Sequence, residues 1–140
     1  MVAFKIFLMN VITFHANRKG ERMCDPMVAE IYALPPIRDK VRLILADAFN
    51  IIIDGGPKGN ARGQRKLHSV FAAIDPVAMD RTAWSIVDRF REAARLPKLD
   101  EKPLARRGAK GRPRHVVTAE RLGLGTADPK RIDHVVKRRA

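Results

Sequence analysis

The stretch SVFAAIDPVAMDRTAWSIV, Ser69–Val87, decides the fold that we predict for this chain of 140 residues. Its first part, Ser69–Ile74, is an apolar run with the length and composition of a buried strand. The run breaks at Asp75-Pro76, and helices commonly begin with aspartate at the N-cap and proline at the first helical position. The sequence therefore predicts a strand that passes directly into a helix. Open α/β sheets hold their ligands at junctions of this kind.

The helix after this junction carries an apolar stripe and is expected to end at Pro97. Because the apolar residues recur at helical spacing, one face of the helix should pack against a sheet. Trp84 flanks that face. The residues of the stripe are Met79, Ala83, Ile86, Val87, Phe90 and Ala94.

Upstream of the junction the patterns predict one helix and one or two strands. Asp25-Pro26 is a helix-start signal, and Pro35-Pro36 ends that helix. Val41–Ala46 is rich in branched residues and predicts a buried strand, which Phe49–Ile53 either continues or follows as a second short strand. The apolar run Val2–Phe14 has no clean period, so helix and strand both stay open there.

Downstream of the junction the sequence predicts a short helix and a last strand. The helix is Val116–Leu122, with Gly123 and Gly125 suited to its C-terminal turn, and the strand is Ile132–Val136. The elements together predict an α/β domain with a small mixed or parallel sheet of three to four strands and two to three helices. A sheet with so few strands leaves its edges exposed, which is typical of an incomplete domain.

The chain is strongly basic, with a formal net charge of +13. The length predicts a single domain over residues 1–140, in which 98–114 is a basic exposed insertion and 137–140 a basic tail. Such a charge favours phosphate-rich partners, although aromatic residues that could stack on bases make up only 6% of the chain. A basic module that binds nucleic acid without sequence specificity is therefore an alternative function. Its contact segments would be Arg62–Lys66, Arg106–Arg114 and Lys137–Arg139.

The cysteine content and the apolar runs exclude several other classes. The single Cys24 cannot form an internal disulfide or a self-contained cysteine-ligated cluster or zinc site. No apolar run reaches the roughly 20 residues that a membrane-spanning helix needs. Residues 1–16 lack the cleavage pattern of a secretory signal, so the chain as it stands is expected in the cytoplasm. The sequence assigns no cofactor.

Five residues form the predicted ligand-binding site. Asp47 and Asp75 each directly follow a predicted strand, and if the two strands are parallel neighbours their side chains emerge at one sheet edge. Gly55 and Gly56 lie in the loop between these strands, where backbone N–H groups can approach a ligand closely. Asp80 follows one turn into the helix. Such a group of oxygen ligands suits a small ligand or a cation, and no reaction is indicated.

Each part of this site also has a structural interpretation. Asp75 can serve only as a helix cap, Asp47 can cap a turn, and Asp80 can be favoured in the first turn by the helix dipole. The glycine-rich loop, residues 54–66, lacks the Gly-Lys-Ser/Thr triplet of a Walker loop, so a flexible surface loop is the simpler interpretation.

Four segments of the chain follow one another in the order of a known family. They are CDPMVAEIYALPPIRDK (24–40), RLILADAF (42–49) with GGP (55–57), AAIDPVAMD (72–80) and GLGTADPKRIDHVV (123–136). Together they resemble the C-terminal part of the domain of unknown function family 362. The DPVAMD element combined with the downstream Gly-Leu-Gly–Asp pattern is the most specific part of the resemblance.

The resemblance implies a globular α/β domain whose functional edge lies near Asp47, Gly56, Asp75 and Asp80. Members of the family often accompany iron–sulfur ferredoxin-like modules, so the resemblance implies a redox-associated partner. The family domain also has a further N-terminal α/β portion, which is a second implied partner. The family supplies no reaction, and a truncated, non-functional fragment of such a domain is a further alternative.

Overall fold

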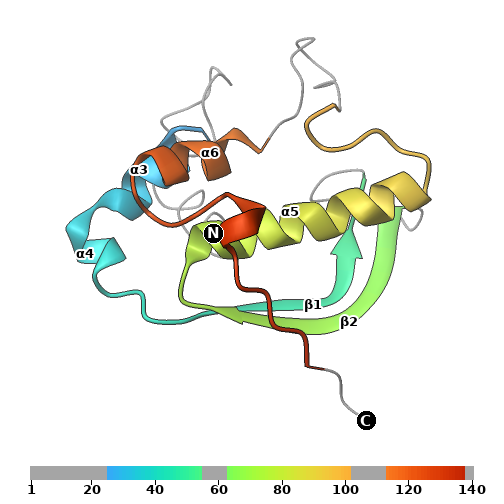
Figure 1. The fold of residues 1–140 in the computed structure, drawn as a ribbon, viewed down its shortest axis with the longest axis horizontal. Helices are drawn as coiled ribbons and strands as arrows, with labels where there is room; N and C mark the ends of the chain where they lie inside the picture. The colour runs from blue at the N-terminus through green and yellow to red at the C-terminus, as the bar shows by residue number, and fades with distance from the viewer. Residues whose placement is uncertain (1–24, 55–62, 102–112, 138–140) are drawn as a thin grey trace.

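The computed structural model describes residues 25–54, 63–101 and 113–137, in which a long helix lies along a two-stranded sheet and shorter helices pack at one end (Figure 1). The predicted α/β class is confirmed. In chain order the elements are α3 (Met27–Ala33), α4 (Pro35–Arg38), β1 (Ile44–Ile52), β2 (Gln64–Ala73), α5 (Pro76–Ala93), α6 (Arg114–Arg121) and the 3₁₀ turn η3 (Pro129–Arg131).

The two strands are antiparallel neighbours, and this corrects the expectation of a mixed or parallel sheet. The pairing runs from Ile44↔Ala73 to Ile52↔Gln64, and the described part of the chain contains no third or fourth strand. The cause lies in the connection over residues 53–63, because a parallel crossover needs about a dozen residues or more and usually a helix. A shorter connection closes a hairpin instead.

The first strand is continuous, so the second predicted strand at Phe49–Ile53 is the continuation of β1. The register shifts between Ala48 and Asn50, and opposite this shift His68 adopts a positive φ of 52°. The Phe49 ring meets the His68 ring edge-on at a centroid distance of 6.3 Å. A bulge of this kind bends the hairpin, and the strands curve upward at one end in Figure 1.

The predicted strand Ile132–Val136 is wrong, because the chain is irregular after η3. The His134 ring lies 6.5 Å from the Phe71 ring of β2, so the segment contacts the sheet through side chains and not through backbone pairing. Val135 and Val136 remain 68% and 65% exposed. The apolar run Val2–Phe14 lies outside the described residues.

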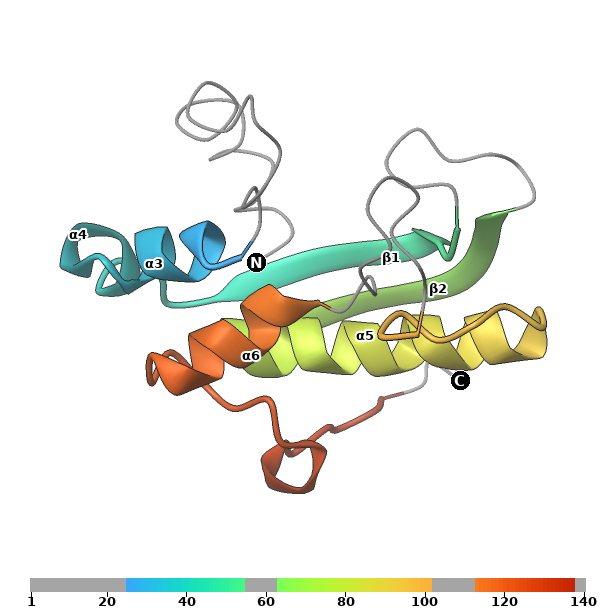
Figure 2. The same cartoon turned by 90° about the horizontal axis from the view of Figure 1, so that it is seen from above.

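Helix α5 begins where the sequence predicts. Asp75 is its N-cap, Pro76 stands at the first helical position, and the helix ends at Ala93. Val77, Met79 and Ile86 are buried, and α5 contacts both strands as well as α6 (Figure 2). The apolar stripe therefore faces the sheet and the smaller helices.

The hydrophobic core lies at the N-terminal end of α5, between α3 and α6. Its buried residues come from three helices and from the turn after α6, and they are Val28, Ala29, Tyr32, Val77, Val116, Ala119 and Leu124. The predicted cap at Asp25 is wrong, because Pro26 occupies the N-cap of α3 without a side-chain bond. Asp25 instead accepts a hydrogen bond from the Thr118 hydroxyl of α6, at 2.5 Å from Oγ1 to Oδ1. None of the helices in the described ranges has the length and apolar character that a bilayer crossing requires.

Candidate functional site

Asp75 joins the start of α5 to the turn that follows α6. Its Oδ1 accepts hydrogen bonds from the backbone N–H groups of Val77 and Ala78, at 2.8 and 2.9 Å. Its Oδ2 accepts a third from Thr126 N–H at 2.9 Å, and the backbone at Gly125 lies against the carboxylate. These bonds give Asp75 the structural role of a cap that also fixes the C-terminal turn.

Asp80 lies on the same side of the sheet as Asp75. It stands in the second turn of α5 and is buried. Its Oδ2 lies 3.5 Å from Nε2 of His115, near the start of α6. The pair joins α5 to α6 through two titratable groups, of which the imidazole is the more exposed.

Asp47 lies apart from these two carboxylates. It is the fourth residue of β1, paired opposite Val70, and it is exposed. Successive side chains of a strand point to opposite faces, so Asp47 faces away from the side on which Ala48 is buried. Its Oδ1 accepts a hydrogen bond from Phe49 N–H at 2.8 Å. This bond to a backbone group two residues away agrees with the structural interpretation of Asp47 as a local cap.

The fold therefore does not assemble the predicted cluster. Asp75 and Asp80 share the N-terminal end of α5, whereas Asp47 sits mid-strand on the opposite face of the sheet. Gly55 and Gly56 lie outside the described residues. Within the described ranges, no group of three or more His, Cys, Asp or Glu side chains is placed to hold a metal ion.

Tyr32 lies in the core close to this end of α5. Burial raises the pKa of its phenol above the ordinary value of 10.0, and the nearby Asp75 carboxylate adds to the rise while Arg38 opposes it. Both leading causes act in the same direction, because a phenolate is disfavoured away from water and beside a negative charge. Tyr32 is therefore held neutral in the folded protein.

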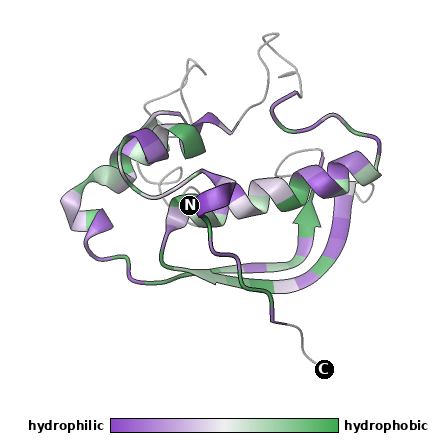
Figure 3. Ribbon diagram, viewed as in Figure 1, coloured by the Kyte–Doolittle hydropathy of each residue, from purple (hydrophilic) through white to green (hydrophobic). Residues whose placement is uncertain are grey.

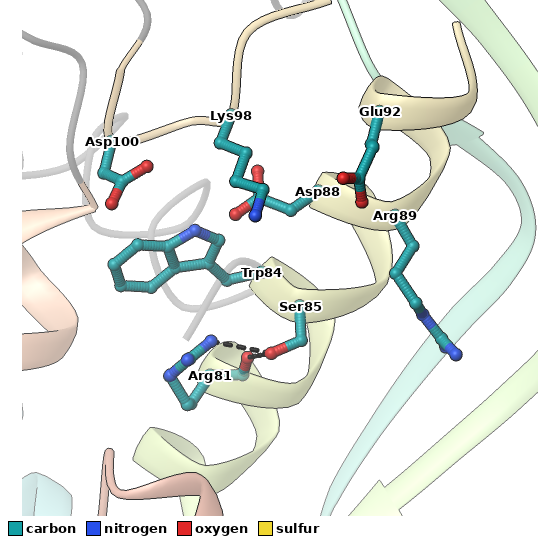
Figure 4. A pocket seen from close by; sticks show the side chains of 8 residues that line it. All are labelled: Arg81, Trp84, Ser85, Asp88, Arg89, Glu92, Lys98 and Asp100. Carbon is teal, nitrogen blue, oxygen red and sulfur yellow. Dashed lines mark hydrogen bonds between the residues drawn. The ribbon is translucent and has the colours of Figure 1, made fainter.

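A hollow lies along the solvent side of α5 (Figure 4). We call it the α5 hollow. It has a volume of about 330 Å³ and is closed on one side by the segment that follows the helix. Its lining residues are Arg81, Trp84, Ser85, Asp88, Arg89, Glu92, Lys98 and Asp100.

Two of these residues are fixed against one another. The Arg81 guanidinium lies over the Trp84 ring, 4.7 Å from its centroid, and Nη1 donates a hydrogen bond of 2.6 Å to Ser85 Oγ. The cation and the ring attract one another through the quadrupole of the aromatic system. The indole Nε1 is buried and has no hydrogen-bond partner in the described structure. Arg81 and Ser85 also line a second hollow of about 130 Å³, together with Thr82, Pro129, Ile132 and His134.

Asp88 holds the other side of the α5 hollow in place. Asp88 Oδ1 accepts a hydrogen bond from Leu99 N–H at 2.8 Å, which draws the segment after α5 back over the helix. Across the described ranges, the side chains of Glu92, Lys98 and Asp100 make no hydrogen bond or ion pair. Charged groups of both signs therefore border the hollow without being paired to one another.

Arg91 holds the C-terminal end of α5 to the sheet. It is 1% exposed, and its guanidinium donates to the carbonyl oxygens of Pro97, at 2.7 Å, and of Ile53. The Asp54 carboxylate lies 3.4 Å from Nη1. One buried cation therefore fixes both the end of β1 and the turn after α5.

The sequence did not single out Arg91, nor Asp88 and its neighbours around the α5 hollow. A signal for the hollow was present, because Arg81, Ser85, Asp88 and Glu92 recur every three or four residues on one helix face. Such a pattern is ordinary for a solvated face. No comparable signal marks Arg91, since an arginine in the last turns of a helix is usually exposed.

Formal charge is distributed unevenly between the described residues, which we call the described body, and the rest of the chain. The described residues carry 15 Lys and Arg against 14 Asp and Glu, a net charge of +1. The remaining +12 of the chain's +13 belongs to residues 1–24, 55–62, 102–112 and 138–140. The described body is therefore nearly neutral.

Neither a protein-family model nor any curated protein or solved structure matches this chain.

Proposed function

We propose that this chain is a ligand-binding α/β domain of the kind that family 362 represents, and that it takes a small polar, charged ligand in the α5 hollow. The observation that carries the proposal is the lining of the hollow, where an indole ring, three cations and three carboxylates border one space of about 330 Å³. Small-molecule sites begin at about this size and combine aromatic surface with a few polar groups.

The strand-end site has weaker support than the hollow. Three backbone donors already bind the Asp75 carboxylate, and Asp47 lies on the opposite face of the sheet. The side chains of Glu92, Lys98 and Asp100 have no such partners within the described ranges, so a ligand could pair with them without first breaking an existing bond. Desolvating a charge is unfavourable unless a partner replaces the water, and a ligand of matching charge would supply that partner.

The experiment uses the fluorescence of Trp84, which is the single tryptophan of the chain. L-lysine, L-glutamate, AMP and inorganic phosphate are titrated separately, as a cationic amino acid, an acidic one, a nucleotide and a simple anion. We expect a saturable change in emission with one of these probes, weakened tenfold or more by Arg81→Gln or Asp100→Asn. Glu30→Gln, an exposed acid on α3, is the matched control and should leave the titration unchanged. If none of the four probes gives a saturable response, the proposal is wrong.

A second function is favoured by the distribution of charge. The segments outside the described body carry +12, which makes them suited to a polyanion, and nucleic acid is the natural candidate. Binding to single-stranded and duplex oligonucleotides is measured from low to high salt, and the affinity should fall steeply as salt is added. Replacing Arg106, Arg107 and Lys110 by glutamine should reduce the salt dependence, whereas Arg38→Gln should not. Absence of binding at low salt would remove this candidate.

The implied iron–sulfur partner and N-terminal portion belong to the same proposal. A chain with one cysteine cannot hold a four-cysteine cluster, so any such cluster would be held by the partner.

A further inference from the structure

The negative charges around the α5 hollow gather at one end of it. Asp88 and Glu92 stand in the second half of α5, where Figure 3 shows strongly hydrophilic residues, and Asp100 lies on the segment that follows the helix. We call these three carboxylates, together with the ammonium group of Lys98, the acidic end of the hollow. Because three negative groups meet one positive group there, this end attracts cations.

Arg81 supplies the positive charge at the other end of the hollow. In Figure 4 its guanidinium lies on one side of the Trp84 ring, whereas Asp88, Lys98 and Asp100 lie on the other side. Arg81 and Asp88 are two helical turns apart on α5, a separation of about 10 Å along the helix axis. Within the described ranges Arg81 donates to Ser85 and makes no ion pair with a carboxylate. The hollow therefore has two ends of opposite charge with an indole ring between them.

Arg89 changes this arrangement little. It borders the hollow, but it is exposed, and in Figure 4 its guanidinium points away from Trp84 and from the carboxylates of the acidic end. A ligand that matches the hollow therefore carries an anionic group for Arg81 and a cationic group, some distance away, for the acidic end.

We propose that the ligand of the α5 hollow is a basic amino acid, with its carboxylate at Arg81 and its side-chain cation at the acidic end. This inference rests on the proposed function, because it names the ligand class of the same hollow. A guanidinium suits a planar carboxylate, and the ligand's cation pairs with Glu92 and Asp100 through charge-assisted hydrogen bonds. The methylene chain of the ligand lies along Trp84, since long basic side chains bury their stems on apolar surface.

The charges of the hollow disfavour the other small ligands. A nucleotide or an acidic amino acid brings a second negative group toward the acidic end, where like charges repel one another. Inorganic phosphate pairs with Arg81 but leaves Glu92 and Asp100 without a cation. An apolar amino acid has the same deficiency, because its side chain offers nothing to the carboxylates.

Three ligands that share one carbon chain test the proposal on the full-length protein by isothermal titration calorimetry. L-lysine has both charged ends, L-norleucine lacks the side-chain ammonium group, and cadaverine lacks the carboxylate. We expect L-lysine to bind at least tenfold more tightly than either of the others, because each of them leaves one end of the hollow unpaired. This series needs no substitution in the protein, so it does not depend on the folding of a variant.

Two variants assign the ends of the ligand. Lys98→Gln should raise the affinity for L-lysine severalfold, because it removes the cation that competes for Glu92 and Asp100. Arg81→Gln should weaken L-lysine toward the affinity of cadaverine and leave cadaverine itself unchanged. Glu30→Gln on α3 is the matched control and should alter neither titration. Circular dichroism establishes that each variant keeps its helices.

The outcomes separate this inference from the proposed function. If L-glutamate, AMP or inorganic phosphate binds and L-lysine does not, the α5 hollow is a ligand site but not one for a basic amino acid. Equal affinities for L-lysine and L-norleucine, or for L-lysine and cadaverine, would overturn the inference in the same way. A weaker or unchanged affinity for L-lysine in Lys98→Gln would show that the cation does not lie at the acidic end. If none of these ligands binds, both proposals are wrong.

Discussion

Asp75 and Gly125 are in contact although 49 residues separate them in the sequence. A Cβ atom added at Gly125 would lie 2.0 Å from Asp75 Oδ1, and Gly125 has a φ of +152°, which side chains rarely adopt. The carboxylate that starts α5 therefore occupies the space in which any other residue at position 125 would place its side chain.

Gly125→Ala should destabilise the protein strongly. The new methyl group both forces an unfavourable backbone angle and displaces the Asp75 carboxylate, so we expect a loss of about 3 kcal/mol in the free energy of unfolding. Urea denaturation followed by circular dichroism measures it. Gly123→Ala is the control, since Gly123 has a φ of +69° with nothing within 4 Å of the added Cβ, and should cost only about 1 kcal/mol. Equal losses in the two variants would contradict the contact.

Asp75→Ala should cost more than the loss of an ordinary helix cap. The substitution removes the acceptor for Val77, Ala78 and Thr126, so we expect about 3 kcal/mol, against about 1 kcal/mol for a simple cap. Asp128→Ala provides the comparison, because Asp128 caps η3 through one bond of 3.0 Å to Lys130 N–H. Thermal denaturation of both variants decides the point, and similar melting temperatures would show that the bond to Thr126 contributes little.

Arg91→Met should destabilise the end of the sheet. The methionine has a similar volume but leaves the buried carbonyl group of Ile53, and the carbonyl group of Pro97, without their donor, at a cost of about 3 kcal/mol. Arg89→Met, at an exposed position two residues earlier, should change the free energy of unfolding by less than about 0.5 kcal/mol. Hydrogen exchange at Ile53 N–H, which donates to Gly63 at 2.8 Å, should accelerate in Arg91→Met alone. Unchanged exchange there would place the effect elsewhere.

Alkaline pH should lower the stability of the protein through the raised pKa of Tyr32. Because the pKa of the phenol is raised in the folded state, its contribution to stability is fully present below pH 10.0 and is lost as pH rises through the folded pKa. Tyr32 is the single tyrosine of the chain, so absorbance of the phenolate near 295 nm reports on this group alone. We expect the phenolate to appear above pH 10.0, and Tyr32→Phe to remove this part of the alkaline loss. A titration at the ordinary value would contradict the burial effect.

The start of α5 and the position of α6 could be predicted from the sequence, because both depend on local patterns. Aspartate followed by proline favours a helix start through the backbone geometry of these two residues. Apolar residues at helical spacing predict a helix that buries one face, whatever that face packs against. The prediction that failed at the N-terminal end, Asp25 as a cap, used the same local grammar. Here the Thr118 hydroxyl, distant in sequence, competes for the carboxylate.

The candidate site depended on the direction of two strands, which apolar content does not specify. A strand buries the same side chains whether its neighbour runs parallel or antiparallel. In the sequence, Asp47 and Asp75 therefore both look like residues that follow the end of a buried strand. The short connection over residues 53–63 was the available clue, and it favours a hairpin. The hairpin places the end of β2 beside the start of β1, so the end-of-strand positions that seemed equivalent are not neighbours.

What the sequence determined by itself is therefore the position of the helices α5 and α6 and the side chain that starts the longest helix, since these follow from interactions within a few residues. The tertiary structure decided which carboxylates share a face, which arginine is buried and which backbone approaches Asp75. Those outcomes depend on contacts such as Asp75 with Gly125 and Arg91 with Ile53. Packing across the whole fold brings these distant residues together, and no periodic pattern in the sequence predicts such pairs.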